Sequence, residues 1–413
     1  MPPRLPIRHI SSIYSIDSIL TLLFVQLRFP ARGCHSLPNI QIATKTFAVR
    51  KTRQTLARLP GMEKPPGQRR SASSHTAKGV RGVLRPSASI LILSPTNQVL
   101  LLRRVQTSTS FASAHVFPGG NLSSFHEGGP LNLEAPEAHQ DNELYRLAAV
   151  RETFEESGIV LACQRDGSGP LHLPSSVIEA GRKEVQASRI RFPDWLATVG
   201  GIPDTASLTP FTRWITPLNM PKRFTTQMYL YPLPLSSPSP SHESIMPTPT
   251  HDGGIEHTAA AFDDARSWLA RARAGEVILF PPQYYLLHLV SELLTGPPPT
   301  DVLDTTGYYQ AQRDALMAFL RTTPVVGREG GKVHRTAGIP WADKVMSPAV
   351  IFTRGADGRV VLGLDKPGPE LERSERGGDW ERVVLVRFGK GGPREMEVRW
   401  REEVVREERE AKL

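Results

Sequence analysis

Apolar residues recur along this chain in short runs that predict β-strands from about residue 87 onward. The runs Ser89–Leu93 and Val99–Leu102 flank the segment Ser94–Gln98, whose Pro and Asn are turn formers, so the pattern is typical of a β-hairpin. Three further strands are expected at Val116–Phe117, Arg213–Ile215 and Thr226–Tyr231.

Other apolar residues have the spacing of an α-helix. Leu144, Leu147, Val150 and Phe154 lie three or four positions apart, and Gly158 follows as a left-handed helix stop. Two further helices are expected over Asp264–Arg273 and Gln283–Leu294. Strands flanked by helices predict a layered α/β fold with a mixed sheet.

Two internal stretches have no apolar period. Residues 121–142 are rich in Gly, Pro, Ser, His and acidic residues, which predicts a surface loop, and residues 232–254 begin with a Pro/Ser tract that predicts a mobile loop. We therefore expect a leader over 1–85, a main α/β domain over 86–325 that contains both loops, and a C-terminal extension over 326–413.

The extension has the texture of a small β-sheet and shows no chemistry of its own. Ala349–Arg354 and Arg359–Leu364 flank the turn Gly355–Gly358, which predicts a hairpin, and Arg382–Phe388 and Met396–Trp400 are expected to extend it.

Charge is distributed very unevenly along the 413 residues. Residues 1–85 carry 15 Lys and Arg against Asp17 and Glu63, a net of +13, so the remaining residues carry −4 of the total of +9. The high pI therefore belongs to the leader, and the globular part does not have the basic balance of a nucleic-acid-binding protein.

The leader is rich in Arg and Ser, almost free of acid and interrupted by Pro and Gly. This composition is typical of a mitochondrial transit peptide or of disorder, and a third interpretation places the true translation start at Met62. The apolar run Ile19–Val25 is shorter than a membrane span, although it is compatible with a secretory signal. Cys34 and Cys163 are the only cysteines, too few for a disulfide framework.

Chemistry concentrates in the helix that ends at Gly158. Glu152, Glu155 and Glu156 fall on one side of it, because side chains three or four positions apart are neighbours on a helix surface. Such a cluster is either a solvated face or a cradle for a hard divalent cation such as Mg²⁺ or Mn²⁺, which takes oxygen ligands.

The segment resembles the Nudix box, G-x5-E-x7-R-E-U-x-E-E-x-G-U, where U is aliphatic. Glu143, Arg151 and the run to Ile159 match its second half in spacing, with Thr153 at an aliphatic position. Gly120 stands 23 residues before Glu143 where the pattern has six, so a loop is inserted. With Leu100–Arg104, Ala114–Gly120, Leu208–Pro217 and Gly275–Gln283, the chain is similar to the Nudix subfamily called motif 19 over roughly residues 86 to 295.

This resemblance implies an α/β/α sandwich and a metal-dependent diphosphatase of coenzyme A or acyl-CoA. It casts Glu152, Glu155 and Glu156, with the carbonyl of Gly119, as ligands of Mg²⁺ or Mn²⁺. Arg151 and Glu143 are expected to pair with each other or with a ligand carboxylate and so orient the ligands. Candidate substrate-binding residues are Arg103, Arg104 and His115, although Arg103 and Arg104 alternate in a strand and at most one faces the pocket.

The resemblance leaves several alternatives open. The general base is either a box glutamate or an acid on a distant segment, with Glu256, Asp263 and Asp264 as candidates. The substrate is alternatively NADH, ADP-ribose or a nucleotide sugar, and a Nudix fold can also serve as a non-catalytic binding module. We expect a small-molecule substrate and neither nucleic acid nor a membrane span.

The end of the sequence predicts a location. Ala411-Lys412-Leu413 is a close variant of the Ser-Lys-Leu peroxisomal address, so a peroxisomal import receptor is the expected partner. The mitochondrion, from the basic leader, is the alternative.

Overall fold

The computed structural model describes residues 82–105, 113–129, 131–220, 222–235, 249–250, 257–322, 328–329 and 332–413. By its contacts the chain divides into two units, and every described residue belongs to the unit made of Met1–Arg28 and Arg81–Leu413. The predictions made for the leader lie outside the described residues, as do those for most of the loop 232–254.

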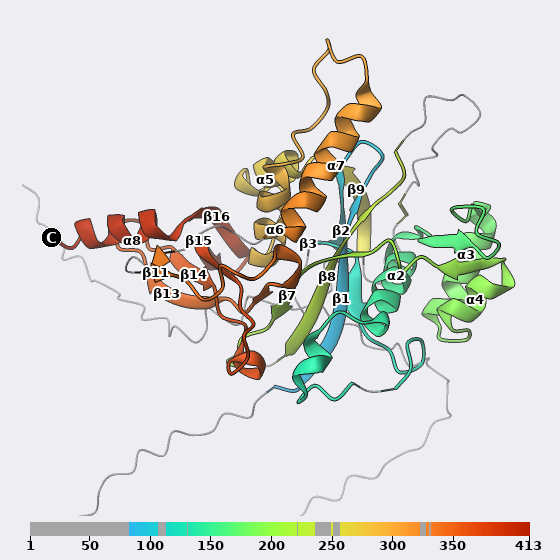
Figure 1. Ribbon diagram of the computed structural model, residues 1–413, viewed down its shortest axis with the longest axis horizontal. Helices are drawn as coiled ribbons and strands as arrows, with labels where there is room; N and C mark the ends of the chain where they lie inside the picture. Colours follow the sequence, from blue (N-terminus) through green and yellow to red (C-terminus); the bar gives the residue numbers. More distant parts are fainter. Residues whose placement is uncertain are drawn as a thin grey trace, which may run out of the picture. The chain divides into compact units, whose positions relative to one another are not determined.

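A mixed sheet is the centre of this unit (Figure 1). Its strand order is β12-β7-β8-β1-β2-β3, with β4 paired to β1 and β9 paired to β2. The pairs β1–β8 and β12–β7 are parallel and the others are antiparallel. The strands are β1 (Leu84–Leu93), β2 (Val99–Arg104), β3 (His115–Val116), β4 (Gly119–Asn121), β7 (Thr209–Ile215), β8 (Arg223–Pro232), β9 (His257–Asp263) and β12 (Val345–Met346).

Helices cover both faces of this sheet, which confirms the predicted layered α/β class. One face packs on α2 (Glu143–Ser157), with α3 (Ser175–Gln186) and α4 (Phe192–Thr198) outside it. The other face packs on α5 (Ala265–Arg273), α6 (Pro281–Ser291) and α7 (Thr305–Arg321). Figure 1 shows α2 and α5–α7 on opposite sides of β1 and β8.

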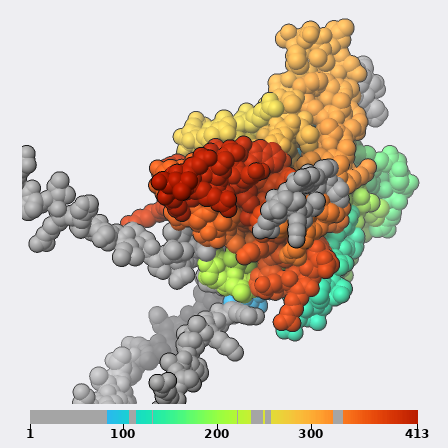
Figure 2. All heavy atoms as spheres, turned by 60° about the vertical axis from the view of Figure 1, so that its left-hand side comes forward, coloured from blue at the N-terminus to red at the C-terminus, as the bar shows by residue number. Residues whose placement is uncertain are grey.

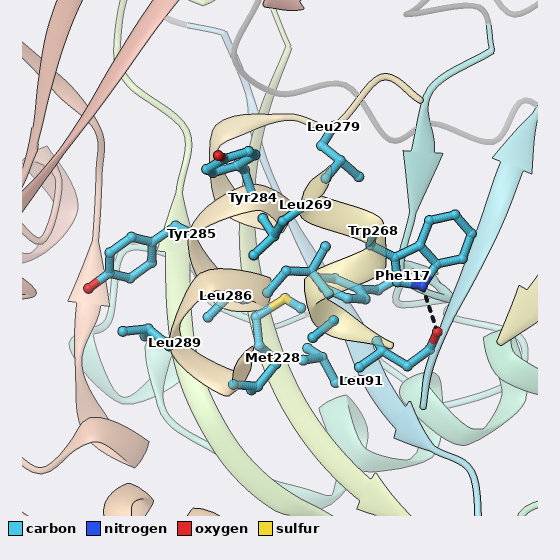
Figure 3. Packing of buried hydrophobic residues seen from close by; sticks show 14 of the residues in the cluster. Leu91, Phe117, Met228, Trp268, Leu269, Leu279, Tyr284, Tyr285, Leu286 and Leu289 are labelled. Carbon is cyan, nitrogen blue, oxygen red and sulfur yellow. Dashed lines mark hydrogen bonds between the residues drawn. The ribbon is translucent and has the colours of Figure 1, made fainter. Parts of the chain in front are cut away.

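Strand alternation divides the core between the two faces. In β1, Ile90 and Ile92 contact the α2 side, whereas Leu91 and Leu93 contact the other side. Figure 3 shows the second cluster, where Trp268 and Phe117 pack among leucines and the Trp268 indole N–H donates to the carbonyl of Val99 at 2.9 Å. The predicted hairpin is confirmed, since Leu93 pairs with Val99 across the turn.

The chain beyond β12 forms a separate four-stranded antiparallel sheet, as predicted. Its order is β13 (Ala349–Thr353), β14 (Val360–Leu364), β15 (Asp379–Gly389) and β16 (Gly392–Trp400), and α8 (Arg401–Glu410) follows at the molecular surface (Figure 2). Val384, Val386 and Met396 belong to the same apolar cluster as α6. The extension therefore shares a core with the main sheet, while the predicted domain boundaries stay a prediction.

The remaining elements are short. They are β5 (Ala162–Gln164), β6 (Gly201–Pro203), β10 (Arg328–Glu329), β11 (Lys332–Val333), and the 3₁₀ turns η1 (Pro136–His139), η2 (Trp341–Asp343) and η3 (Pro369–Leu371). Among the described helices, none has both the length and the apolar character that crossing a bilayer requires.

Candidate active site

Local chemistry sets both ends of α2, the helix that carries the predicted carboxylates. The side-chain oxygen of Asn142 accepts from the amides of Leu144 and Tyr145, which caps the first turn. Gly158 closes the last turn with φ of 73°, a left-handed conformation that favours glycine. The observed bounds, Glu143–Ser157, confirm the prediction.

The last two turns of α2 are buried together with their charges. Glu152, Glu155 and Glu156 are exposed by only 1 to 3%, so the interpretation as a solvated face is wrong. Burying carboxylates is costly unless they are paired or hydrogen-bonded. The cluster therefore needs a structural partner, and Arg151 supplies part of it.

Arg151 is the hub of this cluster. Its Nη1 donates to Glu152 Oε1 and to Glu155 Oε1, both at 2.8 Å. Its Nε donates to Glu127 Oε1 at 2.6 Å and its Nη2 to Glu127 Oε2 at 3.2 Å, a two-pronged contact that only the planar guanidinium geometry allows. The three carboxylates hold the pKa of Arg151 well above its usual value even though burial acts in the opposite direction.

Glu127, which the sequence reasoning missed, takes the orienting role that was predicted for Glu143. Glu143 is exposed at the first turn of α2, and the hydrogen bond of its carboxylate is with the Thr205 hydroxyl. Of the two predicted alternatives, the pairing of Arg151 with ligand carboxylates is therefore confirmed. Its pairing with Glu143 is wrong, because eight helical residues separate the two by about 12 Å along the axis. A signal was present: Glu127 stands seven residues after Gly120, one more than the box pattern has.

The inserted segment is irregular and mostly exposed or half-buried, as expected of a surface loop, but some of its side chains are buried. His126, Glu127 and His139 are all buried. Glu127 is held by the Ser123 amide, which donates to its Oε2 at 2.6 Å, and burial raises its pKa against the effect of Arg151. The insertion thus contributes an ionisable group to the site instead of only lengthening a connection.

The glycine corner lies against the carboxylates. The amide N–H of Gly119 donates to Glu156 Oε2 at 2.8 Å, while the role of its carbonyl as a metal ligand stays a prediction. A side chain at Gly120 would bring its Cβ to 2.6 Å from the carboxylate of Glu152, so only glycine permits this close approach.

Two basic side chains join the same face from β2 and β9. Arg104 is buried and pairs in register with His257, which is also buried and which the sequence reasoning missed. His257 Nδ1 lies 4.0 Å from Glu156 Oε1. A lone histidine in a segment without apolar period carried no signal, because only the pairing of β9 with β2 brings it here.

Arg103 and His115, the other predicted substrate-binding residues, lie on the opposite face of the sheet. They pair in register, and the His115 ring lies 5.7 Å from that of Trp268 in the α5-side core. Burial, with Arg103 and Arg271 nearby, lowers the pKa of His115 to about 4, which keeps its ring neutral. The structure therefore brings Arg104 to the carboxylate face but not Arg103 or His115.

Two of the distant candidates for a general base lie away from the carboxylate cluster. Asp263 and Asp264 are at the far end of β9, six and seven residues beyond His257, which places Asp263 about 20 Å along an extended strand. Asp263 pairs there with Arg271 at 3.2 Å. Neither acid reaches the carboxylate cluster, and Glu256 lies outside the described residues.

The residues of the cluster fit a hard divalent cation by their chemistry. Glu152, Glu155 and Glu156 offer buried carboxylate oxygens on successive turns, and the close approach at Gly120 is a cradle that any larger residue would fill. In the arrangement seen, Arg151 and the Gly119 amide hold them apart, and among the described residues no group of three or more His, Cys, Asp or Glu side chains converges as a metal ion would require.

Parts of this chain match known proteins. Residues 132–289 match the family described as the NUDT19 Nudix domain. A chicken protein named acyl-coenzyme A diphosphatase NUDT19 is 27% identical over 266 residues, which cover 53% of this chain and 67% of that protein. A Caenorhabditis elegans protein named putative nudix hydrolase 7 is 28% identical over 210 residues, covering 51% of this chain and 61% of that protein.

Solved structures are similar as well. The crystal structure of a NUDIX hydrolase from Alicyclobacillus acidocaldarius is 23% identical, with a TM-score of 0.39, and the match covers 50% of this chain and 90% of that one.

The mixed α/β fold and the carboxylate-bearing helix agree with the family match, which supports a Nudix domain over residues 132–289. The match and the names of the relatives support a hydrolase that acts on pyrophosphate bonds. Within that class, the family model and the chicken relative support a likeness to NUDT19 proteins.

Proposed function

We propose that this protein hydrolyses the diphosphate bond of coenzyme A or acyl-CoA to 3′,5′-ADP and (acyl-)4′-phosphopantetheine. The observation that carries the proposal is the buried turn of Glu152, Glu155 and Glu156 against the Gly119–Gly120 corner. The substrate comes from the chicken relative, whose name specifies acyl-coenzyme A. The substrate is inferred from similarity to that relative, whereas the reaction class is inferred from the site residues.

The chemistry divides between charge and position. In the reaction, the oxygen of a water forms a bond to one phosphorus and the bridging P–O bond breaks. The bridging oxygen leaves with the electron pair on the second phosphate, and the proton of the water passes to solvent. A divalent cation such as Mg²⁺ or Mn²⁺, held by Glu152, Glu155 and Glu156, would offset phosphate charge and lower the pKa of water. Arg151 and Glu127 orient two of these carboxylates through hydrogen bonds of 2.6 to 2.8 Å. Arg104 pairs in register with His257 on the same face, and its guanidinium is the proposed partner of a phosphate oxygen.

The direct test offers the full chain CoA, acetyl-CoA, NADH and ADP-ribose with Mg²⁺ or Mn²⁺ and resolves the products by chromatography. We expect 3′,5′-ADP from CoA and acetyl-CoA, and product formation slower by about 100-fold or more from Glu156→Gln. Consumption of NADH or ADP-ribose alone would remove the CoA assignment and keep the hydrolase. A folded wild type that is inert with every substrate and metal would favour a binding module.

Peroxisomal import stays a prediction. Ala411-Lys412-Leu413 follows α8 with Leu413 fully exposed, and Lys412 Nζ lies 3.0 Å from Glu408. Two fluorescent fusions tagged at the first residue, one complete and one lacking the tripeptide, would test it. Peroxisomal signal that persists without the tripeptide, or mitochondrial signal in both, would contradict it.

A further inference from the structure

The carboxylate turn is held at its C-terminal end by a neighbouring helix. The last four carbonyls of a helix have no partner within it, and that of Glu155 is one of them. From α3, Arg182 Nε donates to this carbonyl at 2.8 Å and Gln186 Nε2 donates at 2.6 Å. The backbone of one candidate ligand is therefore fixed by two side chains that come from elsewhere in the sequence.

The same guanidinium also holds a segment that is distant in sequence. Arg182 Nη1 donates to the Thr250 hydroxyl at 2.9 Å, and its Nη2 donates to the Thr250 carbonyl at 3.3 Å. The Thr250 amide in turn donates to the carbonyl of Ser157, the last residue of α2, at 2.9 Å. Arg182 is only 2% exposed, so water competes little for its contact with the Glu155 carbonyl, whereas Thr250 is exposed. Glu179 lies 3.6 Å from Arg182 Nη1 and accepts from the Thr250 hydroxyl at 3.3 Å.

One side chain thus joins three pieces of backbone at the end of the carboxylate turn: α3, the last turn of α2 and Thr250. Seven residues beyond Thr250, the chain reaches His257 beside Glu156. A planar fork with five N–H donors can hold several acceptors at fixed angles, whereas lysine is a compact charge on a flexible stem. The geometry therefore depends on arginine specifically.

A positive charge at this place also has an electrostatic consequence. The C-terminus of a helix carries about half a negative charge, and here it adds to the charge of Glu155 and Glu156. A buried guanidinium at the end of α2 reduces the repulsion that this charge creates. The contact therefore stabilises the turn in the orientation that points its carboxylates toward the glycine corner.

We propose that Arg182 is a positioning residue for the hydrolase site, acting through the Glu155 carbonyl and Thr250 to fix the direction of the carboxylate turn. This rests on the proposed function. Arg182 binds backbone and Thr250 in the contacts described here, so it acts on the orientation of its neighbours and not as a catalytic residue.

The test uses Arg182→Lys in the full chain, with Arg189→Lys as the matched control. Arg189 is an exposed arginine that pairs with Glu184 at 2.6 Å, just beyond α3. For Arg182→Lys we expect kcat to fall about 10-fold or more, as is typical when a residue that orients ligands is changed, with KM for CoA nearly unchanged. The control should keep both constants.

Variants at Thr250 distinguish a positioning role of Arg182 from a general effect on stability. Thr250→Val removes the hydroxyl at nearly constant shape, and Thr250→Ser restores it. We expect Val to lower kcat and Ser to rescue it, and the double variant with Arg182→Lys to lose less than the product of the two single effects. Equal kcat in Arg182→Lys and the control, or a loss that follows only the melting temperature, would overturn the proposal.

Amide hydrogen exchange tests the positioning role of Arg182 without an activity assay. The Thr250 amide should be protected in the wild type and exchange faster in Arg182→Lys, whereas the Arg189→Lys control should match the wild type. An inert wild type would remove the proposed function alone. Unchanged protection of Thr250 in Arg182→Lys would overturn the positioning role whatever the activity.

Discussion

Two buried polar networks differ in the balance of their charges. Around Arg151, one guanidinium is shared by the carboxylates of Glu127, Glu152 and Glu155. Around Asp379, between α6 and β15, one carboxylate is shared by donors: the Tyr285 hydroxyl at 2.6 Å and Arg382 at 3.4 Å. Nearby, Lys344 Nζ donates to the carbonyls of Thr336 and Gly378.

We infer from this difference that the Arg151 network belongs to the proposed reactive site and that the Asp379 network is a structural clamp. Around Asp379, Tyr285 and Arg382 donate to one carboxylate, Arg382 also lies 3.8 Å from Glu381, and two neutral carbonyls accept from Lys344, so cationic and anionic groups are balanced. Carboxylates outnumber the guanidinium around Arg151, so the network has the composition to accept a further cation. Burial of charge alone therefore does not indicate function, because both networks are buried.

Breaking the Asp379 network should give the largest expected effect, a loss of free energy of unfolding. Asp379→Ala leaves Tyr285, Arg382 and Lys344 without their common anion, and removing one partner of a buried pair costs about 3–5 kcal/mol. Denaturant unfolding would measure this, and the exposed Glu184→Ala serves as control. We expect the folded fraction to keep its kcat. A kcat that falls while stability holds would reverse the roles of the two networks.

The carboxylate turn should respond in the opposite way. Glu156→Gln keeps an oxygen for the Gly119 amide but removes the charge, so stability should hold while kcat falls. We expect kcat to fall about 100-fold or more, since changing a residue that only orients ligands already lowers activity by about 10–100-fold. Steady-state kinetics beside a melting curve would measure both. A variant that keeps more than half of the wild-type kcat would contradict the assignment.

Glu127 and Glu143 form a matched pair that sharpens the comparison. Glu127→Gln removes the charge that contacts Arg151 at 2.6 Å and should lower kcat about 10-fold or more. Glu143→Gln changes an exposed residue at the other end of α2 and should leave kcat alone. Parallel kinetics of the two variants would decide which glutamate orients the site, and the reverse ranking would restore the prediction made from spacing.

Lys344, near Asp379, should make the free energy of unfolding depend on pH in the alkaline range. Burial lowers the pKa of Lys344 from 10.5 to about 8. Between these values the unfolded chain binds more protons than the folded one, so the free energy of unfolding should rise with pH, by about 1–2 kcal/mol before tyrosines titrate near pH 10. Lys344→Met should lack this rise in denaturant titrations. The same slope in both proteins would exclude Lys344 as its source.

Much of the fold was predictable because its signals are local. Asn142 and Gly158 cap α2 through their own backbones, and the turn after Leu93 carries its own turn residues, so both elements were found from sequence. Helices α3, α4, α7 and α8 and strand β9 were not predicted. β9 has the segment His257–Asp263, with three successive alanines, and its strand character comes from pairing with β2.

The site was predictable only where one helix determines it. Helical spacing alone gathers Glu152, Glu155 and Glu156, and the same spacing should have excluded Glu143 as the partner of Arg151. Glu127 and His257 arrive through an insertion and through sheet pairing, which spacing does not encode. Strand alternation correctly allowed only one of Arg103 and Arg104 on the pocket face, but it does not indicate which face carries the chemistry, so His115 was misplaced with Arg103 on the α5 face.

Strand β12 has a consequence for synthesis on the ribosome. It pairs in parallel with β7, and the Arg213 amide donates to the carbonyl of Lys344 at 2.8 Å. Residues 216–344 must be translated before β7 receives this neighbour, so a nascent chain carries an open strand edge throughout that interval. Such an edge is a template for pairing with other chains, and a stalled or shortened product would expose it permanently.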